Sequence, residues 1–423
     1  MNKLQRLISK LEKHHKRKID LSLDRTFSLL QKLGNPQNKL KNVINVVGTN
    51  GKYSTIKILQ SILNESGYKC NIYLSPHLQN YTERFIYNDK EINKKDLADL
   101  LELIIKVNGS DKITVFEALT CAFLKYSEKF NENINIIEAG LFHKFDATNV
   151  FKKNLCSIVT SINLDHLNWL KNKSIEGVIH EKTANLPNSK IIISKQENKN
   201  ILIKIKKSLK INKSKKYFYG ESFKYSDLKK NFIKYSDIKG NLILSKPNIL
   251  GEHQIANLST AITASRNLFN IQDTKIKKGL IKINLKGRLQ EIKSGKLKQI
   301  AKNNYLIIDG GHNLNAAKSI AKWMDTLNKD IHLIVGMMKD KEHKKFLNVF
   351  KNKIKSLTLI DIPNQEGAIK KEEFKLKILN DYPNVKIADS IKEAIKLNEI
   401  KSNNSYLGIV GSLYLVGEVL NLN

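Results

Sequence analysis

Short runs of apolar, mostly β-branched residues alternate with longer amphipathic stretches along this chain. The runs predict strands at residues 43–47, 71–74, 134–137, 157–162, 190–194, 305–308, 332–335, 356–360 and 407–410. Between the first two runs, Ile56, Leu59 and Ile62 recur at helical spacing, which predicts a helix at 54–66 that begins at Ser54 as its cap. Strands that alternate with helices are typical of βαβ units around mostly parallel sheets, so we expect an α/β protein.

Residues 195–240 depart from this alternation, because tyrosine and phenylalanine are interleaved with many lysines there. Such a segment could stack on the bases of single-stranded nucleic acid. We favour the alternative, a small, partly β subdomain with a solvated lysine face. A second series of strand–turn–helix units begins near residue 300. We therefore divide the chain near Gly287, into a larger domain at 1–286 and a smaller α/β domain at 287–423.

The composition is that of a globular protein with a sizeable core, since 41% of the 423 residues are hydrophobic. No apolar stretch reaches the roughly 18 residues that a membrane-spanning helix needs. The N-terminal segment is charged throughout, unlike a secretion signal. Cys70, Cys121 and Cys156 are far apart and suggest neither a disulfide framework nor a zinc site. We expect a soluble cytoplasmic protein with no membrane partner.

The formal net charge of +33 would ordinarily suggest a nucleic-acid partner. However, only six of the 73 basic residues are arginines, and arginine is the better bidentate ligand of phosphates and bases. The lysines are spread along the chain beside many asparagines and isoleucines, which indicates a general compositional bias. We therefore expect no nucleic-acid partner.

Polar residues follow four successive predicted strands, at the ends where parallel sheets bind their ligands. After the first strand, GTNGK resembles a phosphate-binding turn, but Tyr53 separates Lys52 from Ser54, whereas the usual loop has its hydroxyl directly after the lysine. The other strand ends carry Ser75 and His77, Glu138, and Asp165 and His166. Glu138, His166 and a serine hydroxyl would suit Mg²⁺ beside nucleotide phosphates. Considered singly, each could be a cap or a structural histidine, but four polar clusters in succession favour a site.

Longer motifs surround these residues in the order VVGTNGKYS, LSPHL with YTERF, TVFEALT, EAGLFHKFDATNV, TSINLDHLNWL, HEKTANL, GEHQIANLSTAI, KGRLQEI, IIDGGHNLNAA, GMMKDKE and GSLYLVGEV. Together, across nearly the whole chain, they resemble the motifs of the folylpolyglutamate synthase/dihydrofolate synthase family of the Mur ligase superfamily. The family loop is G-T-N-G-K-G-S, so a spacer after Lys52 belongs to this type of loop. The resemblance implies a Mur-ligase-type P-loop ATPase domain with a mostly parallel sheet, followed by a smaller Rossmann-like α/β domain.

The resemblance also implies a reaction. ATP would phosphorylate the carboxylate of dihydropteroate or of a reduced folate, and the amine of L-glutamate would attack the resulting acyl phosphate. Such transfer depends on charge neutralisation and positioning more than on protein nucleophiles. The implied cofactors are ATP and one or two Mg²⁺ ions, with a monovalent cation as a further candidate, and the implied state is a monomer.

Carried over position by position, the resemblance assigns nucleotide contacts to Thr49, Asn50, Gly51 and Lys52, with Ser54 supporting the loop, and to Asn257, Arg288 and Asp309. It implies Mg²⁺ ligation by Ser75, Glu138 and His166, and by Lys182 if this lysine is carbamylated. The implied catalytic residues are Lys52, His312 and Lys182, with His312 near the γ-phosphate. Without its motif, Lys182 would be one more surface lysine among many.

For the pterin end of the acceptor, the resemblance implies three segments. These are Asp20, Leu21 and Ser22; Thr114, Val115, Phe116 and Glu117; and Phe145, Asp146 and Ala147. Asp20 and Asp146 make chemical sense there, because a carboxylate can accept hydrogen bonds from the ring N–H and amino groups of a pterin. On residue type alone, a helix cap is an equally good explanation of Asp20.

The chain departs from the family pattern at three places. Tyr53 stands where the family has glycine, and a side chain is allowed there if the backbone is helical. Phe142-His143-Lys144 replaces Gly-Gly-Arg, and 183–186, TANL, replaces Ala-Gly-Ile after the carbamylated lysine. We expect an active but altered enzyme, in which the pterin pocket and the second metal site differ more from the family than the ATP site does.

Two other interpretations compete with this one. Another Mur-type ligase could act on a nucleotide-linked peptidoglycan precursor, but the pterin-type segments IDLS and TVFEALT argue against it. A lysine-rich nucleic-acid-binding NTPase or an inactive scaffold would instead show steeply salt-dependent polynucleotide binding and no glutamate-dependent turnover.

Overall fold

The computed structural model describes residues 3–14, 20–228, 231–398 and 404–423. Contacts divide the chain into two compact units, Met1–Pro247 with Ile255–Ile283, and Asn248–Gln254 with Asn284–Asn423. The boundary predicted near Gly287 lies close to this division. The segment Asn248–Gln254, which we had placed in the first domain, groups instead with the second unit, where Leu250 packs against the buried core.

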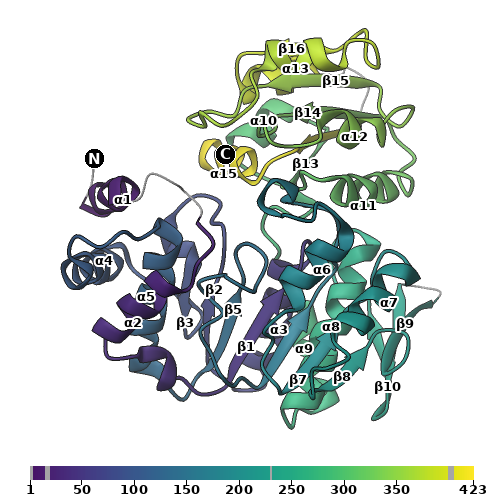
Figure 1. Ribbon diagram of the computed structural model, residues 1–423. Coiled ribbons are helices and arrows are strands. Elements are labelled where there is room, and N and C mark those ends of the chain that lie inside the picture. Colours follow the sequence, from purple (N-terminus) through teal and green to yellow (C-terminus); the bar gives the residue numbers. More distant parts are fainter. Residues whose placement is uncertain (1–2, 15–19, 229–230, 399–403) are drawn as a thin grey trace. The chain divides into compact units, whose positions relative to one another are not determined.

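The first unit is built on an eight-stranded sheet in the order β4-β3-β2-β5-β1-β6-β7-β8 (Figure 1). The strands are β1 (Val43–Val47), β2 (Cys70–Tyr73), β3 (Phe85–Tyr87), β4 (Lys90–Glu91), β5 (Ile134–Glu138), β6 (Cys156–Val159), β7 (Lys190–Ile193) and β8 (Lys215–Phe218). The six strands from β2 to β8 in this order pair in parallel, whereas β3 and β4 form an antiparallel edge. The five strands predicted in this part of the chain are confirmed, although β6 ends at Val159.

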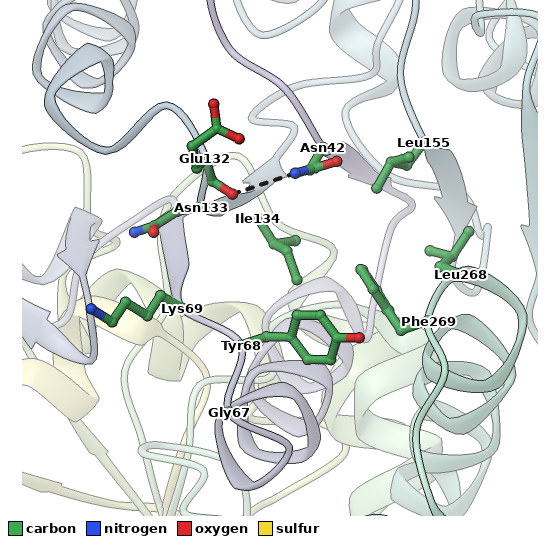
Figure 2. A pocket seen from close by; sticks show the side chains of 10 residues that line it. All are labelled: Asn42, Gly67, Tyr68, Lys69, Glu132, Asn133, Ile134, Leu155, Leu268 and Phe269. Carbon is green, nitrogen blue, oxygen red and sulfur yellow. Dashed lines mark hydrogen bonds between the residues drawn. The ribbon is translucent and has the colours of Figure 1, made fainter.

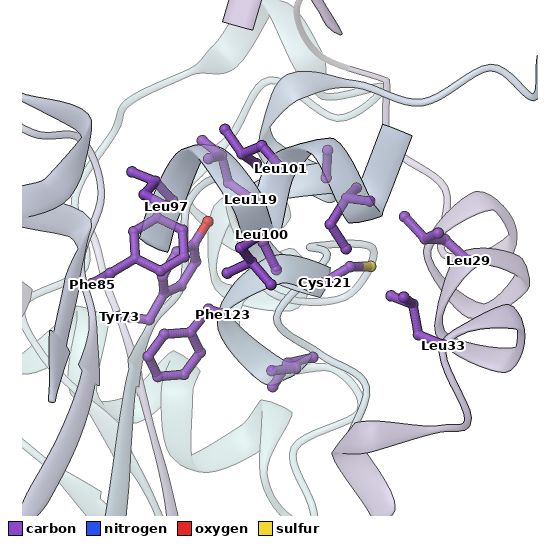
Figure 3. Close-up of a cluster of buried hydrophobic side chains, with 14 of the residues drawn as sticks. Leu29, Leu33, Tyr73, Phe85, Leu97, Leu100, Leu101, Leu119, Cys121 and Phe123 are labelled. Atoms are coloured by element: carbon purple, nitrogen blue, oxygen red, sulfur yellow. The ribbon is translucent and has the colours of Figure 1, made fainter. Parts of the chain in front are cut away.

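Helices cover both faces of this sheet. They are α1 (Lys3–His14), α2 (Asp24–Lys32), α3 (Lys52–Glu65), α4 (Lys94–Asn108), α5 (Val115–Ser127), α6 (Ile175–Thr183), α7 (Lys199–Ser208), α8 (Glu252–Leu268) and α9 (Asp273–Ile281). Val43 and Val47 of β1 point to the same face because their spacing is even. Val43 belongs to the core with α1, α2, α4 and α5, and Val47 to the core with α6 and α7. Figure 3 shows part of the first core, where Leu29 of α2, Leu101 of α4 and Phe123 of α5 are buried. Elsewhere in the unit, α3 and α9 pack so closely that a Cβ added to Gly279 of α9 would lie only 2.8 Å from Cα of Ile62 in α3.

The lysine-rich segment contributes a second, smaller sheet. Strands β9 (Phe223–Leu228), β10 (Phe232–Asp237) and β11 (Gly240–Ser245) pair antiparallel in the order β11-β10-β9. Ile233 and Tyr235 are buried, and the hydroxyl of Tyr235 lies 2.9 Å from Oγ1 of Thr263 in α8. Lys224, which lies on the opposite face, is exposed. The prediction of a partly β segment holds for β9 and β10, whereas the first part of residues 195–240 forms α7 and strand β8 of the large sheet.

The second unit has a six-stranded sheet in the order β12-β13-β17-β14-β15-β16. Its strands are β12 (Gln290–Ile292), β13 (Tyr305–Asp309), β14 (Ile331–Val335), β15 (Ser356–Ile360), β16 (Lys386–Ala388) and β17 (Tyr406–Val410). Only β12 pairs antiparallel, with β13. The helices are α10 (Lys296–Ala301), α11 (Leu314–Met324), α12 (His343–Asn348), α13 (Lys371–Ile378), α14 (Ile391–Leu397) and α15 (Leu413–Leu422). The predicted α/β architecture is confirmed for both units, and with it the four strands predicted here.

Candidate functional site

The glycine-containing turn after β1 is approached so closely that two of its positions admit only glycine. A Cβ on Gly48 would lie 1.9 Å from Oγ1 of Thr160, and one on Gly51 would lie 2.4 Å from Oδ1 of Asn257. Gly51 has a φ of 90° and precedes the first residue of α3, in the left-handed region that favours glycine. The predicted nucleotide-binding residue Asn257 therefore does lie against the turn.

The helix after this turn begins at Lys52, two residues before the predicted start. Ser54 is buried within the first turn and is not the cap; Gly51 takes that position, without a capping side chain. The prediction of a Ser54 cap was wrong because the left-handed Gly51 lets the helix start earlier. A helix start without a capping side chain leaves backbone N–H groups available to an anion. Tyr53 is helical, so its side chain needs no left-handed backbone.

The loop that follows β6 braces the phosphate-binding turn. The hydroxyl of Thr49 accepts a hydrogen bond from the backbone amide of Asn163 at 3.0 Å. The same hydroxyl donates to the backbone carbonyl of Asn163 at 3.1 Å. The amides of Thr49 and Asn50 both donate to the carbonyl of Ser161, at 2.8 and 3.2 Å. Because these two amides are already bonded, the first turn of α3 and the Lys52 side chain are the better candidates for binding phosphate.

Two lysines converge on one carbonyl of the turn. Lys52 Nζ donates to the Gly48 carbonyl at 3.3 Å, and Lys182 Nζ donates to the same oxygen at 2.9 Å. Lys182 is only 3% exposed. Its burial, together with the nearby charge of Lys52, lowers the pKa of Lys182 to about 7. A carbamate forms on the neutral amine, so this environment is compatible with the modification that the resemblance implies.

The structure brings together two of the predicted metal ligands. The amide of Ser75 donates to Oε2 of Glu138 at 3.1 Å, and Oε1 of Glu138 lies 3.8 Å from Lys52 Nζ. His166 has a left-handed backbone; its Nε2 lies 3.8 Å from Oδ2 of Asp165. Hydroxyl and carboxylate oxygens fit Mg²⁺, which keeps waters and phosphate oxygens as its other ligands. Among the described residues, no group of three or more His, Cys, Asp or Glu side chains could hold a metal ion.

The segment that replaces the family's Gly-Gly-Arg packs on the predicted metal site. Phe142 is 2% exposed and has a φ of 60°, an outlier for a bulky residue. Its ring centroid lies 5.4 Å from Lys182 Nζ and 6.3 Å from the centroid of His166. His143 is fully buried, and neither ring nitrogen has a hydrogen-bond partner in the described part of the chain. Burial, with a contribution from Lys182, lowers the pKa of His143 to about 3.

Asp146 supports its own loop. Its carboxylate accepts from the amide of Leu141 at 2.8 Å and from the amide and the hydroxyl of Thr148 at 3.0 and 2.5 Å. Burial raises the pKa of Asp146. Phe145 beside it is 40% exposed, whereas Ala147 is buried. Of this predicted pterin segment, Phe145 offers the accessible surface, and the part of Asp146 in binding stays a prediction.

The other two predicted pterin segments are joined by a residue that sequence reasoning missed. Arg25, near the start of α2, lies 3.0 Å from Oδ2 of Asp20 and donates to Glu117 at 2.8 Å. Glu117 also forms a capping box with Thr114 at the start of α5. The scarcity of arginine in this lysine-rich chain was a signal that could have drawn attention to Arg25.

In the second unit, Asp309 is buried at the end of β13. It accepts from the amide of Leu289 at 2.8 Å and from that of Gly311 at 2.7 Å. Burial raises the pKa of Asp309, while the charge of Arg288 opposes the rise. His312 Nδ1 lies 3.0 Å from the Gly310 carbonyl. Asp309 thus fixes the backbone next to both Arg288 and His312, whose contacts with a nucleotide stay predictions.

A cavity of about 430 Å³ lies at the opposite end of the first sheet, beside the amino ends of its strands (Figure 2). Asn42 precedes β1, Lys69 precedes β2 and Ile134 begins β5, so the cavity opens at the amino ends of these strands. Ligands of parallel sheets bind beyond the carboxyl ends. This cavity is therefore separate from the phosphate-binding turn.

Comparison with known proteins decides the family. A dihydrofolate synthase/folylpolyglutamate synthase of Buchnera aphidicola subsp. Acyrthosiphon pisum is 30% identical over 400 residues, which cover 90% of this chain and 89% of that protein. The chain belongs to the dihydrofolate synthase/folylpolyglutamate synthase family. It is accordingly an ATP-dependent ligase, and the reaction of the family is the addition of glutamate.

Further members of the family support this. The dihydrofolate synthetase of Saccharomyces cerevisiae is 29% identical and is aligned over 96% of this chain and 98% of its own length. Residues 291–422 match the family described as dihydrofolate synthetase, C-terminal domain. The structure of Escherichia coli FolC in complex with DHPP and ADP superposes with a TM-score of 0.85 at 27% identity, over 99% of this chain and 97% of that one. The synthase fold expected from the sequence is thereby confirmed.

None of the described helices has the length and apolar character required to cross a bilayer.

Proposed function

We propose that this chain joins L-glutamate both to dihydropteroate and to reduced folates, at the expense of ATP. The observation that carries the proposal is that charged side chains converge at the carboxyl ends of the strands of the first sheet. There, Lys52 and Lys182 share the carbonyl of Gly48 and Glu138 lies beside Lys52. The Escherichia coli relative, which binds DHPP and ADP, aligns over nearly the full length of both chains.

The residues at these strand ends suit phosphoryl transfer. The first turn of α3 and Lys52 would receive phosphate oxygens and neutralise their charge. Ser75 and Glu138 would hold Mg²⁺, which supplies further positive charge beside the phosphates. The backbone bonds from Thr49 and Asn50 to Ser161 keep the turn in place without using side chains that the nucleotide needs. Lys182 would extend the site once it is carbamylated.

The reaction then follows from positioning. The carboxylate of the acceptor attacks the γ-phosphorus, ADP leaves, and an acyl phosphate forms. The amine of glutamate attacks the acyl carbon and displaces phosphate, leaving an amide. No protein nucleophile is required, in agreement with a site made of cations, backbone amides and a carboxylate.

A second candidate is a synthase that acts on dihydropteroate alone. Two observations favour it specifically, because the yeast relative is a dihydrofolate synthetase and the C-terminal family match carries the same description. The bulky Phe142-His143-Lys144 segment beside Phe145 could exclude one of the two acceptors.

The experiment that separates the two is glutamate-dependent phosphate release from Mg·ATP, run in parallel with dihydropteroate and with tetrahydrofolate. Release with both acceptors is the expected result. Release with dihydropteroate alone would establish the second candidate. Folded protein that binds ATP and releases phosphate with neither acceptor would overturn both.

A further inference from the structure

Arg25 ties two separate segments of the first unit together through one guanidinium group. Its Nε donates to both carboxylate oxygens of Glu117, at 3.1 and 3.2 Å, and its Nη2 donates to Oε1 at 2.8 Å. The same Nη2 donates to the backbone carbonyl of Asp20 at 2.9 Å, and Nη1 lies 3.0 Å from Oδ2 of that residue. Arg25 thus bonds to both the backbone and the side chain of Asp20.

The two carboxylates differ in their surroundings. The side chain of Glu117 is 4% exposed, and its Oε2 also accepts from the amide of Thr114 at 2.8 Å. It is therefore fixed at the start of α5. The side chain of Asp20 is 31% exposed, and so remains accessible to a ligand. A planar guanidinium holds such a pair at a defined distance and angle, which a lysine ammonium cannot do.

Arg25 also brings a fixed positive charge to this group. Its guanidinium faces the carboxyl groups of both Glu117 and Asp20. The hydrogen bond to Glu117 raises the pKa of Arg25 above its ordinary value, which keeps the guanidinium charged at any working pH. A carboxylate that is accessible and oriented is suited to accept from the ring N–H and amino groups of a pterin.

We propose that Arg25 is a positioning residue for the acceptor: it holds the carboxylate of Asp20 against the start of α5, in the orientation that binds the pterin ring. This inference rests on the proposed function. Dihydropteroate and tetrahydrofolate share the pterin end, so Arg25 affects both acceptors alike. On this assignment only the pterin end of the acceptor meets these residues, so we expect the binding of ATP and of glutamate not to depend on them.

The test is steady-state kinetics of Arg25→Gln and Arg25→Lys, with each substrate varied in turn. A charge-assisted hydrogen bond typically changes affinity by about tenfold to about a hundredfold. We therefore expect KM for each pterin acceptor to rise by about that factor in Arg25→Gln. Arg25→Lys keeps the positive charge but loses the planar, forked set of N–H donors, so it should recover only part of the lost acceptor affinity. KM for ATP and for glutamate should stay within about twofold, since a twofold change is below the effect of one such bond.

Two controls separate positioning from folding. Arg25→Gln leaves the buried carboxylate of Glu117 without its guanidinium partner, which destabilises the unit. The double variant Arg25→Gln/Glu117→Gln removes that carboxylate as well. It should therefore regain thermal stability but keep the raised KM for the acceptor. Arg266 is a matched control, because it is 8% exposed and its Nη1 bonds Oδ1 of Asp237 at 3.1 Å in the small sheet. Arg266→Gln should lower the melting temperature and leave every KM unchanged.

The outcomes are distinct. A raised acceptor KM in both Arg25 variants and in the double variant supports the inference. An active wild type whose Arg25→Gln variant keeps its acceptor KM, or a double variant that regains both stability and acceptor KM, overturns it. Wild-type protein that releases no phosphate with either acceptor overturns the proposed function, and this inference with it.

Discussion

Lys52 and Lys182 direct their ammonium groups at the same backbone oxygen, the carbonyl of Gly48. One lysine begins the helix after β1, and the other lies in the last turn of α6. Their mutual repulsion adds to burial in lowering the pKa of Lys182. The two residues are thus coupled before any ligand arrives, and a nucleotide phosphate would relieve the repulsion.

Lys52→Ala should abolish most of the ligation and leave the fold intact. We expect kcat to fall by about 100-fold or more, the range typical for loss of a group that stabilises transition-state charge. Phosphate release with saturating substrates measures the effect. Lys57→Ala, which removes another lysine of α3, is the control and should retain activity. Near-normal turnover by the Lys52→Ala variant would refute the role of Lys52 at the phosphates.

Tyr53→Gly, which restores the family residue, should preserve or raise activity. Tyr53 is helical, so glycine there costs about 0.5 kcal/mol of stability through lost helix propensity and relieves no strained backbone. Chemical denaturation and turnover, with Tyr53→Ala as the control for the side chain alone, separate the two effects. A folded but inactive glycine variant would mean that the tyrosine side chain has a specific task.

At Phe142 we expect glycine to be tolerated better than alanine. Both substitutions remove a buried ring, at a cost of about 3–5 kcal/mol. Only glycine relaxes the left-handed backbone, so Phe142→Gly should be more stable than Phe142→Ala by about 1 kcal/mol. Urea unfolding of both variants measures the difference.

Phe346 provides the matched control for this comparison. It is 1% exposed and lies in α12, where the backbone is helical, so glycine should there be less stable than alanine by about 1 kcal/mol. The same order at both positions would contradict the strain assigned to Phe142.

His253 should make stability fall in mild acid. Burial and the charge of Arg288 lower the pKa of His253 to about 4, below its ordinary value. The unfolded chain therefore binds more protons than the folded one between about pH 4 and 6.5, and stability falls as pH drops through that window. From pH 7 to 5 the wild type should lose about 1 to 2 kcal/mol more than His253→Gln. Equal losses in parallel denaturation curves would contradict the assignment.

The nine strands that the sequence analysis named were predictable because their β-branched runs are buried on both faces, whereas short strands such as β3, β12 and β16 were missed. β8 was not predicted either, since its residues, Lys215–Phe218, include two lysines and only two apolar side chains at the end of the sheet. The two-residue β4, Lys90–Glu91, is wholly polar. The start of α3 was misplaced because the left-handed backbone of Gly51 cannot be read from residue type alone.

The composition of the site was predictable to a similar extent. The positions of the motifs predicted that Lys52, Glu138 and Ser75 lie near one another, because the carboxyl ends of parallel strands lie on the same side of a sheet. The partnership of Arg25 with Glu117 joins residues 92 positions apart, and no local pattern indicates such a pair. The same holds for Asp146, whose carboxylate is used within its own loop.

The central claim is that ATP activates the acceptor carboxylate for attack by glutamate. Its most direct test uses dihydropteroate with both carboxylate oxygens labelled with ¹⁸O, incubated with Mg·ATP and glutamate, followed by mass spectrometry of the released phosphate. Transfer through an acyl phosphate predicts that each phosphate carries one labelled oxygen and that the amide retains the other. Phosphate released without label, or formed at the same rate when glutamate is omitted, would contradict it.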